Sequence, residues 1–438
     1  MKFIGVMTGN SLDAIDIVLT DFNHKQIKDI CGHSKPIPQE IREKFILLRQ
    51  KLSSNFGDIE NIYQESTADF HLLHDEYIKL VAQTIDELIS QNNISKSDIK
   101  AVGFHGQTCH HFPPSIAGET NEPSTLQIGS GQMLADLIEL PVVFDFRSDD
   151  IMNGGEGSPL SPIHHMHIAE NLKEQEIFPL AFCNGGNSGN ITIISEDLNS
   201  KELQVIGWDV GPFNHFVDYL ARTEADLPCD LDGQIGSQGQ TNFNLRDKLF
   251  SSAVITANGR NFLHISPPKS SDPAWYKIIP ELVDKSIPLA DRIYTAECFS
   301  AEIFVRSLGQ IPFNFKRPKH FLLFGGGWNN PVIRNHFEKT LRGKNTSFHY
   351  GSKSIKSTYI PDAIIQKSDT FGYSSKYMEA RLIADMAKCF IDNQPYTLPA
   401  VTNCQSSTKC GTIAYPQGNN NILWSRAAKG WSNKKESR

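Results

Sequence analysis

The sequence predicts an α/β fold made of two lobes, each built on its own mixed sheet. One observation behind this prediction is a repeated unit, in which an apolar strand, a polar turn with glycine and a second apolar strand follow one another. The first copy covers residues 3–19 and the second covers residues 180–194. The other observation is the alternation of short apolar strands with helical patterns, which is typical of α/β proteins. A chain of 438 residues is long enough for two separate cores.

Both polar turns contain the step Gly-Asn-Ser, at Gly9–Ser11 and at Gly186–Ser188. Glycine is needed where φ is positive or where the backbone approaches a ligand, and successive N–H groups can form a nest for phosphate. Two such turns, one opening each half of the chain, suggest a duplicated fold that holds a nucleoside triphosphate. Two unrelated β-hairpins explain the pattern equally well, because short glycine turns are common.

The first half alternates helical and strand patterns after its opening hairpin. Residues 39–92 are mostly helical, because apolar residues such as Leu73, Tyr77 and Leu80 recur at helical spacing. Short strands are expected at residues 99–104, 125–129 and 141–144, and a short helix at residues 132–138. A charged connector at residues 170–178 marks the expected boundary between the lobes.

The second half repeats the alternation. After the second hairpin we expect strands at residues 205–209 and 320–324, and helices at residues 214–222, 289–308, from 331 onward, and 375–391. The domain prediction is therefore an N-terminal lobe at residues 1–172 and a C-terminal lobe at residues 173–425. A basic tail at residues 426–438 is expected to be frayed.

Composition and charge narrow the class of protein. The net charge of −7 gives no reason to expect nucleic acid as a partner. No apolar run approaches the roughly 20 residues of a membrane helix, and the polar turn at Thr8–Ser11 cuts the N-terminal apolar stretch too short for a signal peptide. The eight cysteines lack zinc-site spacing and are expected to be reduced thiols, which favours a cytoplasmic protein. Cys109, beside two histidines, is interpreted as a surface-loop residue rather than a nucleophile.

Glycine turns and a few acids must supply the chemistry, because the sequence has no P-loop, protein-kinase catalytic loop or Gly-x-Ser-x-Gly elbow. Gly325–Gly327 ends a predicted strand and precedes a helix, so its backbone can lie against a planar or phosphorylated ligand. A plain loop is the alternative.

Asp209 comes at the expected end of a strand, before Gly211 and Pro212. It is placed to act as a general base or to cap the next helix, and the sequence leaves both open.

Three other charged positions have a functional and a structural interpretation. Asp16 follows the first turn and could meet a hydrated magnesium ion or face solvent. Glu379 starts the buried face of its helix by the spacing of the apolar residues after it, so it needs a partner or a metal, unless it is stabilised by the helix N-terminus. Arg147 could bind an anionic substrate group. The three histidines of residues 164–167 are interpreted as helix surface and core rather than metal ligands.

Taken in order, these motifs resemble the anhydro-N-acetylmuramic acid kinase family, within the sugar-kinase/actin-type ATPase fold. The resemblance covers nearly the whole chain, to about Pro416. The motifs that carry it are Gly9–Asp16, Phe104–Thr108, Thr125–Gly129, Asp145–Arg147 with Asp150 and Gly154–Leu160, Asp209–Pro212, Pro267–Ser270, Gly325–Gly327 and Leu398–Thr402.

The resemblance implies an enzyme with a central cleft that uses ATP and magnesium. The family opens the 1,6-anhydro ring of its sugar with water and phosphorylates O6, giving N-acetylmuramic acid 6-phosphate in the recycling of cell-wall sugars. By analogy Asp209 activates the water, and Glu379 faces the metal directly or through water. The residues implied to bind ATP are Gly9, Asn10, Ser11, Leu12, Asp13, Ala14, Ile15, Asp16, Gly185, Gly186, Asn187, Gly325, Gly326 and Gly327. Those implied to contact the sugar are His105, Gln107, Arg147 and Asn214.

The chain also departs from the family pattern. The departures are Asn10 for threonine, Ala14 for glycine, a changed second turn at Asn187, Phe213 for glycine, and Asp272 and Pro273 after the Pro-Pro-Lys-Ser motif. Three hypotheses therefore remain: a functional anhydromuramate kinase, a kinase of another anhydrosugar such as levoglucosan, and a homologue that binds nucleotide without turnover. The sequence leaves the oligomeric state open, with a homodimer among the options.

Overall fold

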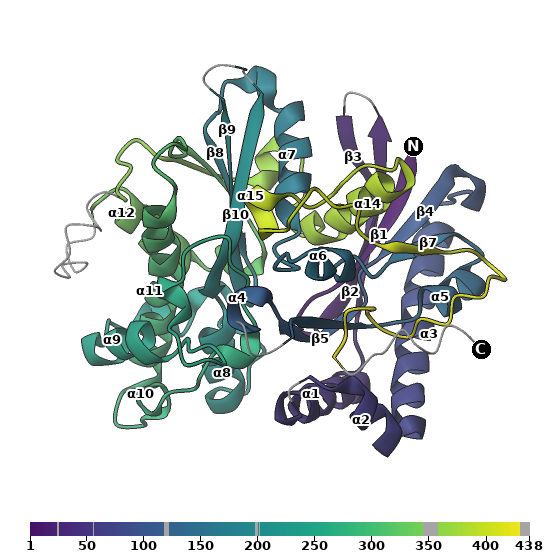
Figure 1. Cartoon of the computed structure of the whole chain (residues 1–438). Helices are drawn as coiled ribbons and strands as arrows, with labels where there is room; N and C mark the ends of the chain where they lie inside the picture. The colour runs from purple at the N-terminus through teal and green to yellow at the C-terminus, as the bar shows by residue number, and fades with distance from the viewer. Residues whose placement is uncertain are drawn as a thin grey trace. The chain divides into compact units, whose positions relative to one another are not determined.

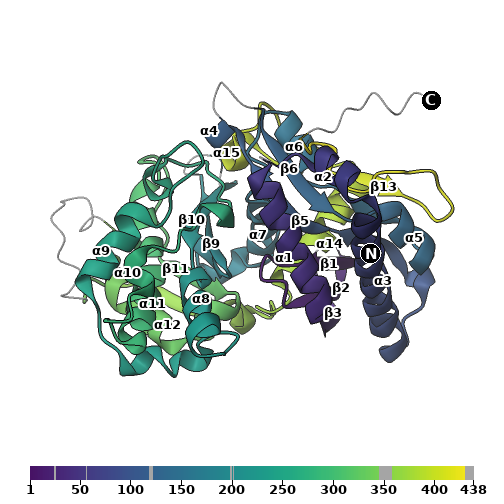
Figure 2. The same cartoon turned by 90° about the horizontal axis from the view of Figure 1, so that it is seen from below.

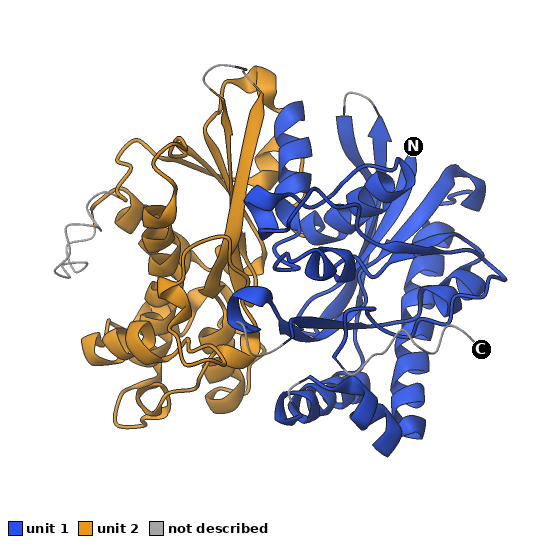
Figure 3. Ribbon diagram, viewed as in Figure 1, with its two compact units in different colours: residues 1–171, 377–438 blue, residues 172–376 orange. Residues whose placement is uncertain are grey.

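A computed structural model describes residues 1–23, 26–55, 57–117, 122–197, 200, 202–344 and 358–429. The chain divides into two compact units, one of residues 1–171 and 377–438 and the other of residues 172–376 (Figure 3). The first boundary falls next to the predicted one. The second corrects the prediction, because residues 377–425 belong to the first unit and not to a C-terminal lobe. Most of the predicted frayed tail, residues 430–438, lies outside the described residues.

The first unit is built on a six-stranded mixed sheet of order β13-β7-β4-β1-β2-β3. Strands β1, β2 and β3 form an antiparallel meander, while β4 runs parallel to β1 and β7 parallel to β4 (Figure 1). The strands are β1 (Lys2–Thr8), β2 (Ala14–Asn23), β3 (Gln26–Pro36), β4 (Ile99–Phe104), β7 (Val142–Phe144) and β13 (Thr412–Ala414), and a separate two-stranded sheet pairs β5 (Gln107–Phe112) with β6 (Ser124–Ile128).

Helices α3 (Thr67–Gln91), α5 (Gly131–Ile138), α7 (Ser161–Asn171) and α14 (Met378–Ile391) pack against this sheet. The other helices of the unit are α1 (Gln39–Ser54), α2 (Ile59–Glu65), α4 (Pro114–Ala117), α6 (Ser148–Met152) and α15 (Pro399–Thr402), with a 3-10 turn η1 (Lys96–Asp98). The core of the unit joins the buried faces of α1, α3 and α5 to side chains of the sheet. Helix α14 begins three residues later than predicted at residue 375, and α7 ends where the charged connector was expected to begin.

Helix α14 lies directly against the backbone of the central strands (Figures 1 and 2). A Cβ atom at Gly5 of β1 would overlap the carbonyl oxygen of Ala380, and one at Gly103 of β4 would overlap that of Ile383. Both strand positions therefore have to be glycine, and the helix presents small residues such as Ala384 to the sheet. This close contact explains why the chain returns to the first unit after residue 376.

The second unit repeats the plan of the first with a five-stranded sheet of order β10-β9-β8-β11-β12. Again three antiparallel strands are followed by two strands that run parallel to the first of them. The strands are β8 (Leu180–Gly185), β9 (Ser188–Glu196), β10 (Leu203–Pro212), β11 (His320–Phe324) and β12 (Ile364–Lys367). The predicted duplication of mixed sheets is confirmed, and the two hairpins seen in the sequence occupy the same place in each sheet.

Helices of the second unit are α8 (His215–Glu224), α9 (Phe243–Ser252), α10 (Pro280–Val283), α11 (Leu289–Ser307) and α12 (Pro331–Leu341). Shorter 3-10 turns are η2 (Lys173–Gln175), η3 (Leu231–Gly233), η4 (Gly236–Gln238), η5 (Phe262–His264), η6 (Pro273–Trp275), η7 (Leu308–Gln310), η8 (Gly326–Asn329) and η10 (Ser368–Phe371). Helices α11 and α12 pack side by side (Figures 1 and 2).

Two further sequence interpretations are settled by the fold. Cys109 lies inside strand β5 and is buried, so its interpretation as a surface-loop residue was wrong. Burial raises the pKa of its thiol to about 11, which keeps it protonated.

All eight cysteines lie among the described residues as free thiols. Across the described part of the chain, no helix combines the length and apolar character needed to span a membrane.

Candidate active site

The first glycine turn joins β1 to β2 in the first unit. The backbone N–H of Leu12 donates to the carbonyl oxygen of Gly9 at 3.2 Å, and Leu12 has a φ of 58°. Its side chain is only 1% exposed and belongs to the core of the unit. Asn10 and Asp13 on either side of it are exposed. The turn is thus anchored by one buried leucine, with exposed polar residues on either side of it.

Arg49 of α1 braces this turn, and sequence reasoning missed it. Its Nη1 donates to the carbonyl oxygen of Asn10 at 2.8 Å, and its Nε and Nη2 donate to that of Thr108 at 3.2 and 2.9 Å. The planar guanidinium fork therefore links the first turn to the start of β5. Because these contacts span 39 and 59 residues of sequence, no local pattern indicates them.

His105 and Arg147, both predicted to contact the sugar, lie together in the first unit. Arg147 donates from Nε to Nε2 of His105 at 3.2 Å and from Nη1 to the carbonyl oxygen of Gly157 at 3.3 Å. Burial and then the Arg147 charge lower the pKa of His105 to about 3, so the imidazole is neutral near pH 7. Its Nδ1 carries the proton and donates to the carbonyl oxygen of Gly106 at 3.0 Å. The neutral histidine thus orients the arginine without opposing its charge.

Gln107 follows His105 by two residues and is fully buried. Its Nε2 donates to the carbonyl oxygen of Thr108 at 3.2 Å. Within the described residues, its Oε1 accepts no hydrogen bond. A buried amide oxygen without a partner carries a desolvation penalty, which a ligand donor or a water molecule would remove.

The loop next to Arg147 is shaped by two buried acids. Asp150 accepts from the backbone N–H of Gly157 and from Oγ1 of Thr402, both at 2.7 Å. Glu156 accepts from Oγ of Ser115 at 2.6 Å. The bonds to Thr402 and Ser115 join segments far apart in sequence, whereas the bond to Gly157 closes the loop on itself. These contacts hold the loop next to Arg147 in place.

Arg426 corrects the prediction that the tail frays from residue 426. Its Nε pairs with Oδ2 of Asp145 at 2.6 Å, and its Nη2 pairs with Oδ2 of Asp149 at 2.8 Å. Asp145 is buried, and Ser148 also donates to it. The first residue of the predicted tail is therefore anchored to the segment that carries Arg147.

Glu379 lies in the first turn of α14 and is half-buried, so the prediction that it starts the buried face was wrong. The buried face begins with Met378 and Ala380 on either side of it. Asp16 of β2 is also half-buried. Tyr377 precedes Glu379 by two residues, and burial followed by the charge of Asp16 raises the pKa of Tyr377. Helix α14 also packs against β2, the strand that carries Asp16.

The second glycine turn, in the second unit, joins β8 to β9. The backbone N–H of Phe213 donates to the carbonyl oxygen of Asn187 at 2.9 Å, and that of Asn214 donates to Gly186 at 3.1 Å. The turn is thus held against the junction between β10 and α8. The Phe213 side chain is fully buried, with its ring centroid 4.7 Å from that of Trp328 and 5.4 Å from that of Phe304. It packs behind the turn, within the core.

The glycine triplet lies beside this second turn. Gly325 has a φ of 91°, and a Cβ there would come within 2.7 Å of Oδ1 of Asn184 and 2.8 Å of the carbonyl oxygen of Gly185. A Cβ at Gly326 would meet no atom within 4 Å, so that position is open. Gly327 contacts the side-chain amide of Asn214. Asn214, predicted as a sugar contact, thus belongs to the second unit, whereas His105, Gln107 and Arg147 belong to the first.

Asp209, the predicted base, is buried within β10, which continues to Pro212. The prediction that Asp209 ends the strand was wrong, although the strand pairing with β9 shifts register between Asp209 and Gly211. Its Oδ2 accepts from the backbone N–H of Ser271 at 2.8 Å, from Oγ of Ser271 at 3.2 Å and from Oγ of Ser270 at 3.4 Å. Such donors stabilise the ionised carboxylate and fix its orientation.

A chain of hydroxyl groups joins Asp209 to the second glycine turn. The hydroxyl of Tyr276 lies 2.9 Å from Oγ of Ser271 and 2.8 Å from Oγ of Ser188. Tyr276 is buried, and burial raises the pKa of its phenol. Sequence reasoning did not find Ser271 or Tyr276, because they follow the Pro-Pro-Lys-Ser motif where the chain departs from the family pattern.

Lys269 of that motif lies next to this network. Its backbone carbonyl accepts from the N–H of Asp209 at 3.1 Å, and its Nζ donates to the carbonyl oxygen of Phe262 at 3.2 Å. The Nζ also lies 4.6 Å from the centroid of the Phe262 ring. Burial lowers the pKa of Lys269 to about 7, although the Asp209 charge acts in the opposite direction.

The repeated sheet order and a glycine turn at the same hairpin of each sheet define the class of the protein, the sugar-kinase/actin-type ATPases. The chain belongs to the anhydro-N-acetylmuramic acid kinase family, since the sequence model described as "Anhydro-N-acetylmuramic acid kinase" matches residues 1–416.

Curated relatives and solved structures were also compared. A protein of Zymomonas mobilis named anhydro-N-acetylmuramic acid kinase is 30% identical over 421 residues, covering 95% of this chain and 100% of that protein. One of Hahella chejuensis with the same name is 28% identical, covering 94% and 98%. A structure of (R)-2-hydroxyglutaryl-CoA dehydratase component A of Acidaminococcus fermentans is 11% identical with a TM-score of 0.41, covering 88% of this chain and 96% of that chain.

Proposed function

We propose that this protein is an ATP-dependent kinase that opens 1,6-anhydro-N-acetylmuramic acid with water and phosphorylates O6, giving N-acetylmuramic acid 6-phosphate. Family membership over residues 1–416 carries the proposal. The curated relatives bear the name of this activity, and they match along almost their whole length. A place in the recycling of cell-wall sugars and a location in the cytoplasm are parts of the same proposal.

Asp209 is the proposed general base. It would take a proton from a water molecule whose oxygen attacks the anomeric carbon C1. The bond between C1 and the bridging oxygen breaks, and that oxygen stays on C6 and accepts the γ-phosphoryl group of ATP, which leaves ADP. The two donors of Ser271 support this role, because they fix the orientation of the Asp209 carboxylate.

The glycine turns are the proposed ATP contacts. Gly9–Asp16 in the first unit and Gly185–Asn187 in the second would bind the phosphates through backbone N–H groups. The open position of Gly326 supports a place for the nucleoside at the triplet. Asp16 of β2 and Glu379 of α14 stand on two elements that pack together. They offer carboxylate oxygens, the donor type that magnesium prefers, and would hold it directly or through water. When bound, magnesium supplies positive charge that offsets the charge of the phosphates.

Arg147 is the proposed contact for the lactyl carboxylate of the sugar, since a guanidinium group binds a carboxylate through two parallel hydrogen bonds. Its orientation by the neutral His105 and by Gly157 supports this role. Gln107 would contact the sugar through its Oε1, which lacks a partner within the described residues.

A substrate panel tests the proposal against its alternatives. ADP release is measured with magnesium, ATP and each of three additions: 1,6-anhydro-N-acetylmuramic acid, levoglucosan, or no sugar. We expect turnover with the first only, because levoglucosan lacks the lactyl carboxylate. Turnover with levoglucosan at an equal or higher kcat/KM would favour a kinase of another anhydrosugar. No release above background with any sugar would favour a nucleotide-binding homologue, although the burial of Phe213 behind the second turn removes one reason for that hypothesis.

A further inference from the structure

A cluster of mostly buried polar side chains contains no residue assigned to the proposed reaction. It joins α7 to α14 in the first unit and consists of His164 and His167 from α7 and Asp385 and Cys389 from α14. Sequence analysis favoured a structural interpretation of the histidines. The structure adds an acid and a thiol from a second helix, which no spacing in the sequence connects to them.

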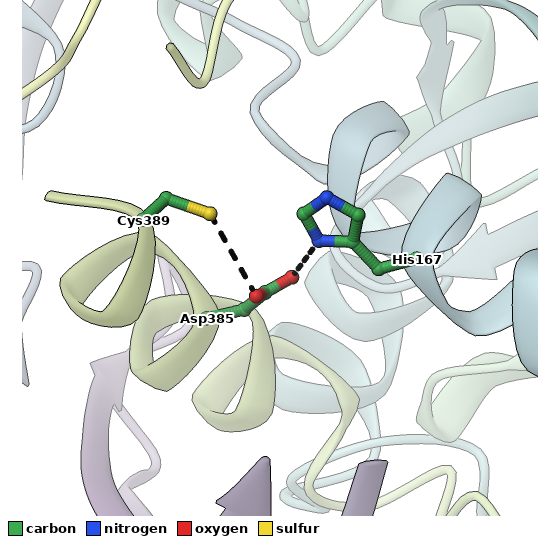
Figure 4. Close-up of side chains that lie close together, drawn as sticks. All are labelled: His167, Asp385 and Cys389. Atoms are coloured by element: carbon green, nitrogen blue, oxygen red, sulfur yellow. Dashed lines mark hydrogen bonds and ion pairs between the residues drawn. The ribbon is translucent and has the colours of Figure 1, made fainter. Parts of the chain in front are cut away.

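Helical spacing brings these groups to one point. His164 and His167 are three residues apart on α7, and Asp385 and Cys389 are four residues apart on α14, so each pair lies on one face of its helix. Nδ1 of His167 is 2.7 Å from Oδ2 of Asp385, and Sγ of Cys389 is 3.9 Å from Oδ1 (Figure 4). The nearest ligand atoms of His167, Asp385 and Cys389 all lie within 4.8 Å of one another.

We propose that His167, Asp385 and Cys389 form a binding site for one zinc-class divalent cation. Imidazole nitrogen, carboxylate oxygen and thiolate sulfur are the three donor types that zinc takes in proteins. Donor atoms around a tetrahedral zinc ion stand roughly 3.3–3.7 Å apart, as its bond lengths require. The 3.9 Å between Sγ of Cys389 and Oδ1 of Asp385 lies just above this range, and Nδ1 of His167 and Oδ2 of Asp385 would need to separate from 2.7 Å by less than about 1 Å. Water fills the fourth position.

Surrounding residues hold the carboxylate in place. Nδ1 of His164 donates to Oδ2 of Asp385 at 2.8 Å, and Nε2 of His164 accepts from Nε of Arg381 at 3.4 Å. The arginine contact fixes the histidine tautomer, so His164 supports Asp385 and is not itself a ligand. Arg381 also pairs with Asp29. Supporting hydrogen bonds of this kind orient the ligands of known metal sites.

The cluster is partly accessible to solvent, and it lies on the two helices at which the chain leaves and re-enters the first unit. The side chain of His167 is 26% exposed, while those of Asp385 and Cys389 are buried. Helix α7 ends at Asn171, the last residue before the chain enters the second unit, and α14 begins directly after the chain returns at Tyr377. A bound metal ion would therefore cross-link α7 and α14.

The test is zinc binding to the purified full-length chain, first stripped of metal with a chelator. We expect one Zn²⁺ ion per chain in competition with a chromophoric chelator, and a thiolate charge-transfer band when Co²⁺ replaces zinc. Cys389→Ser should remove that band, and both Cys389→Ser and His167→Gln should weaken zinc binding at least tenfold. Cys410→Ser is the matched control, because Cys410 is also buried in the first unit and hydrogen-bonds to Thr397 and Thr408 instead of the cluster.

Several results would overturn the proposal. They are the absence of stoichiometric binding, binding that persists unchanged in both ligand variants, and a Co²⁺ spectrum without the thiolate band. The half-buried position of His167 keeps the experiment decisive, since His167→Gln should fold even if a change at Cys389 does not. None of these readouts depends on ATP or sugar, so their failure would leave the proposed kinase activity untouched.

Discussion

Single residues around Asp209 define what the proposed base can do. Ser271 holds one carboxylate oxygen with two donors, and Tyr276 connects Ser271 to Ser188 in the second glycine turn. The orientation of the base is therefore linked to the loop proposed to bind phosphate. This link requires the phenolic hydroxyl and not the ring, whose packing against His215 is a separate contact.

Tyr276→Phe should lower kcat about tenfold while leaving the KM for ATP within about twofold. The change removes two hydrogen bonds of about 1 kcal/mol each, one to Ser271 and one to Ser188, and one tenfold step in rate corresponds to about 1.4 kcal/mol. Steady-state kinetics measure both constants. Tyr294→Phe, in α11 of the same unit, is the control and should change neither. An unchanged kcat in Tyr276→Phe would show that the hydroxyl chain is not used.

The buried and neutral His105 makes the free energy of unfolding depend on pH. The folded pKa of His105 is about 3, below the unfolded value of about 6.5. Below pH 6.5 the unfolded chain binds a proton that folded His105 does not, so the free energy of unfolding falls as the pH falls. The loss from this one group should approach about 1.4 kcal/mol per pH unit between pH 6 and pH 4.

Urea unfolding at pH 7, 5 and 4 checks this sign. His105→Gln cannot titrate, so the difference in stability between wild type and variant should shrink as the pH falls. Other buried histidines, such as His111 and His165, contribute equally to both proteins. A difference that stays constant from pH 7 to pH 4 would contradict the assignment of a neutral His105.

Sequence reasoning reached some of these residues and not others, for physical reasons. Asp209 and Arg147 stand in recognisable motifs, but Arg49, Tyr276 and Arg426 act through contacts with residues far away in the chain. Glu379 was misjudged because apolar spacing marks a helix face only approximately, and the buried residues of the first turn are Met378, Ala380 and Arg381. The packing of Phe213 depends on Trp328, which no local pattern connects to it.

At the scale of elements, the two hairpins were predictable because each turn and its two flanking apolar strands are adjacent in the sequence. The return of α14 to the first sheet was not, since it depends on the match between strand glycines and helix alanines. In retrospect, Gly5 and Gly103 inside strands are the signal, because glycine within a strand often marks a close backbone approach.

Two glycine substitutions separate packing from ligand contact. Gly5→Ala should lower the free energy of unfolding by about 1–3 kcal/mol, because the added methyl overlaps the backbone of α14. Gly326→Ala should leave stability within about 0.5 kcal/mol, since no atom lies within 4 Å of the new methyl. Instead, Gly326→Ala should raise the KM for ATP. Chemical denaturation measures the free energy of unfolding of both variants, and steady-state kinetics measure their KM for ATP. Equal destabilisation by the two substitutions would contradict the close contact between Gly5 and α14.

The whole molecule repeats one strand order in two units, and the chain returns to its first unit at the end. Duplication explains why the sequence shows similar hairpins nearly 180 residues apart. It also distributes the proposed reaction across the chain, with Arg147, Asp16 and Glu379 in one unit and Asp209 and the glycine triplet in the other. The oligomeric state, including the homodimer considered from sequence, stays a prediction.

The central claim is that Asp209 activates the attacking water in a kinase that acts on 1,6-anhydro-N-acetylmuramic acid. The most direct measurement compares ADP release by wild type and Asp209→Asn with magnesium, ATP and this sugar, alongside nucleotide binding to both. Asparagine keeps the shape of the side chain but cannot accept the proton. The account predicts turnover by wild type, a loss of at least about a thousandfold in the variant, and equal nucleotide affinity. Turnover by Asp209→Asn within tenfold of wild type would contradict it.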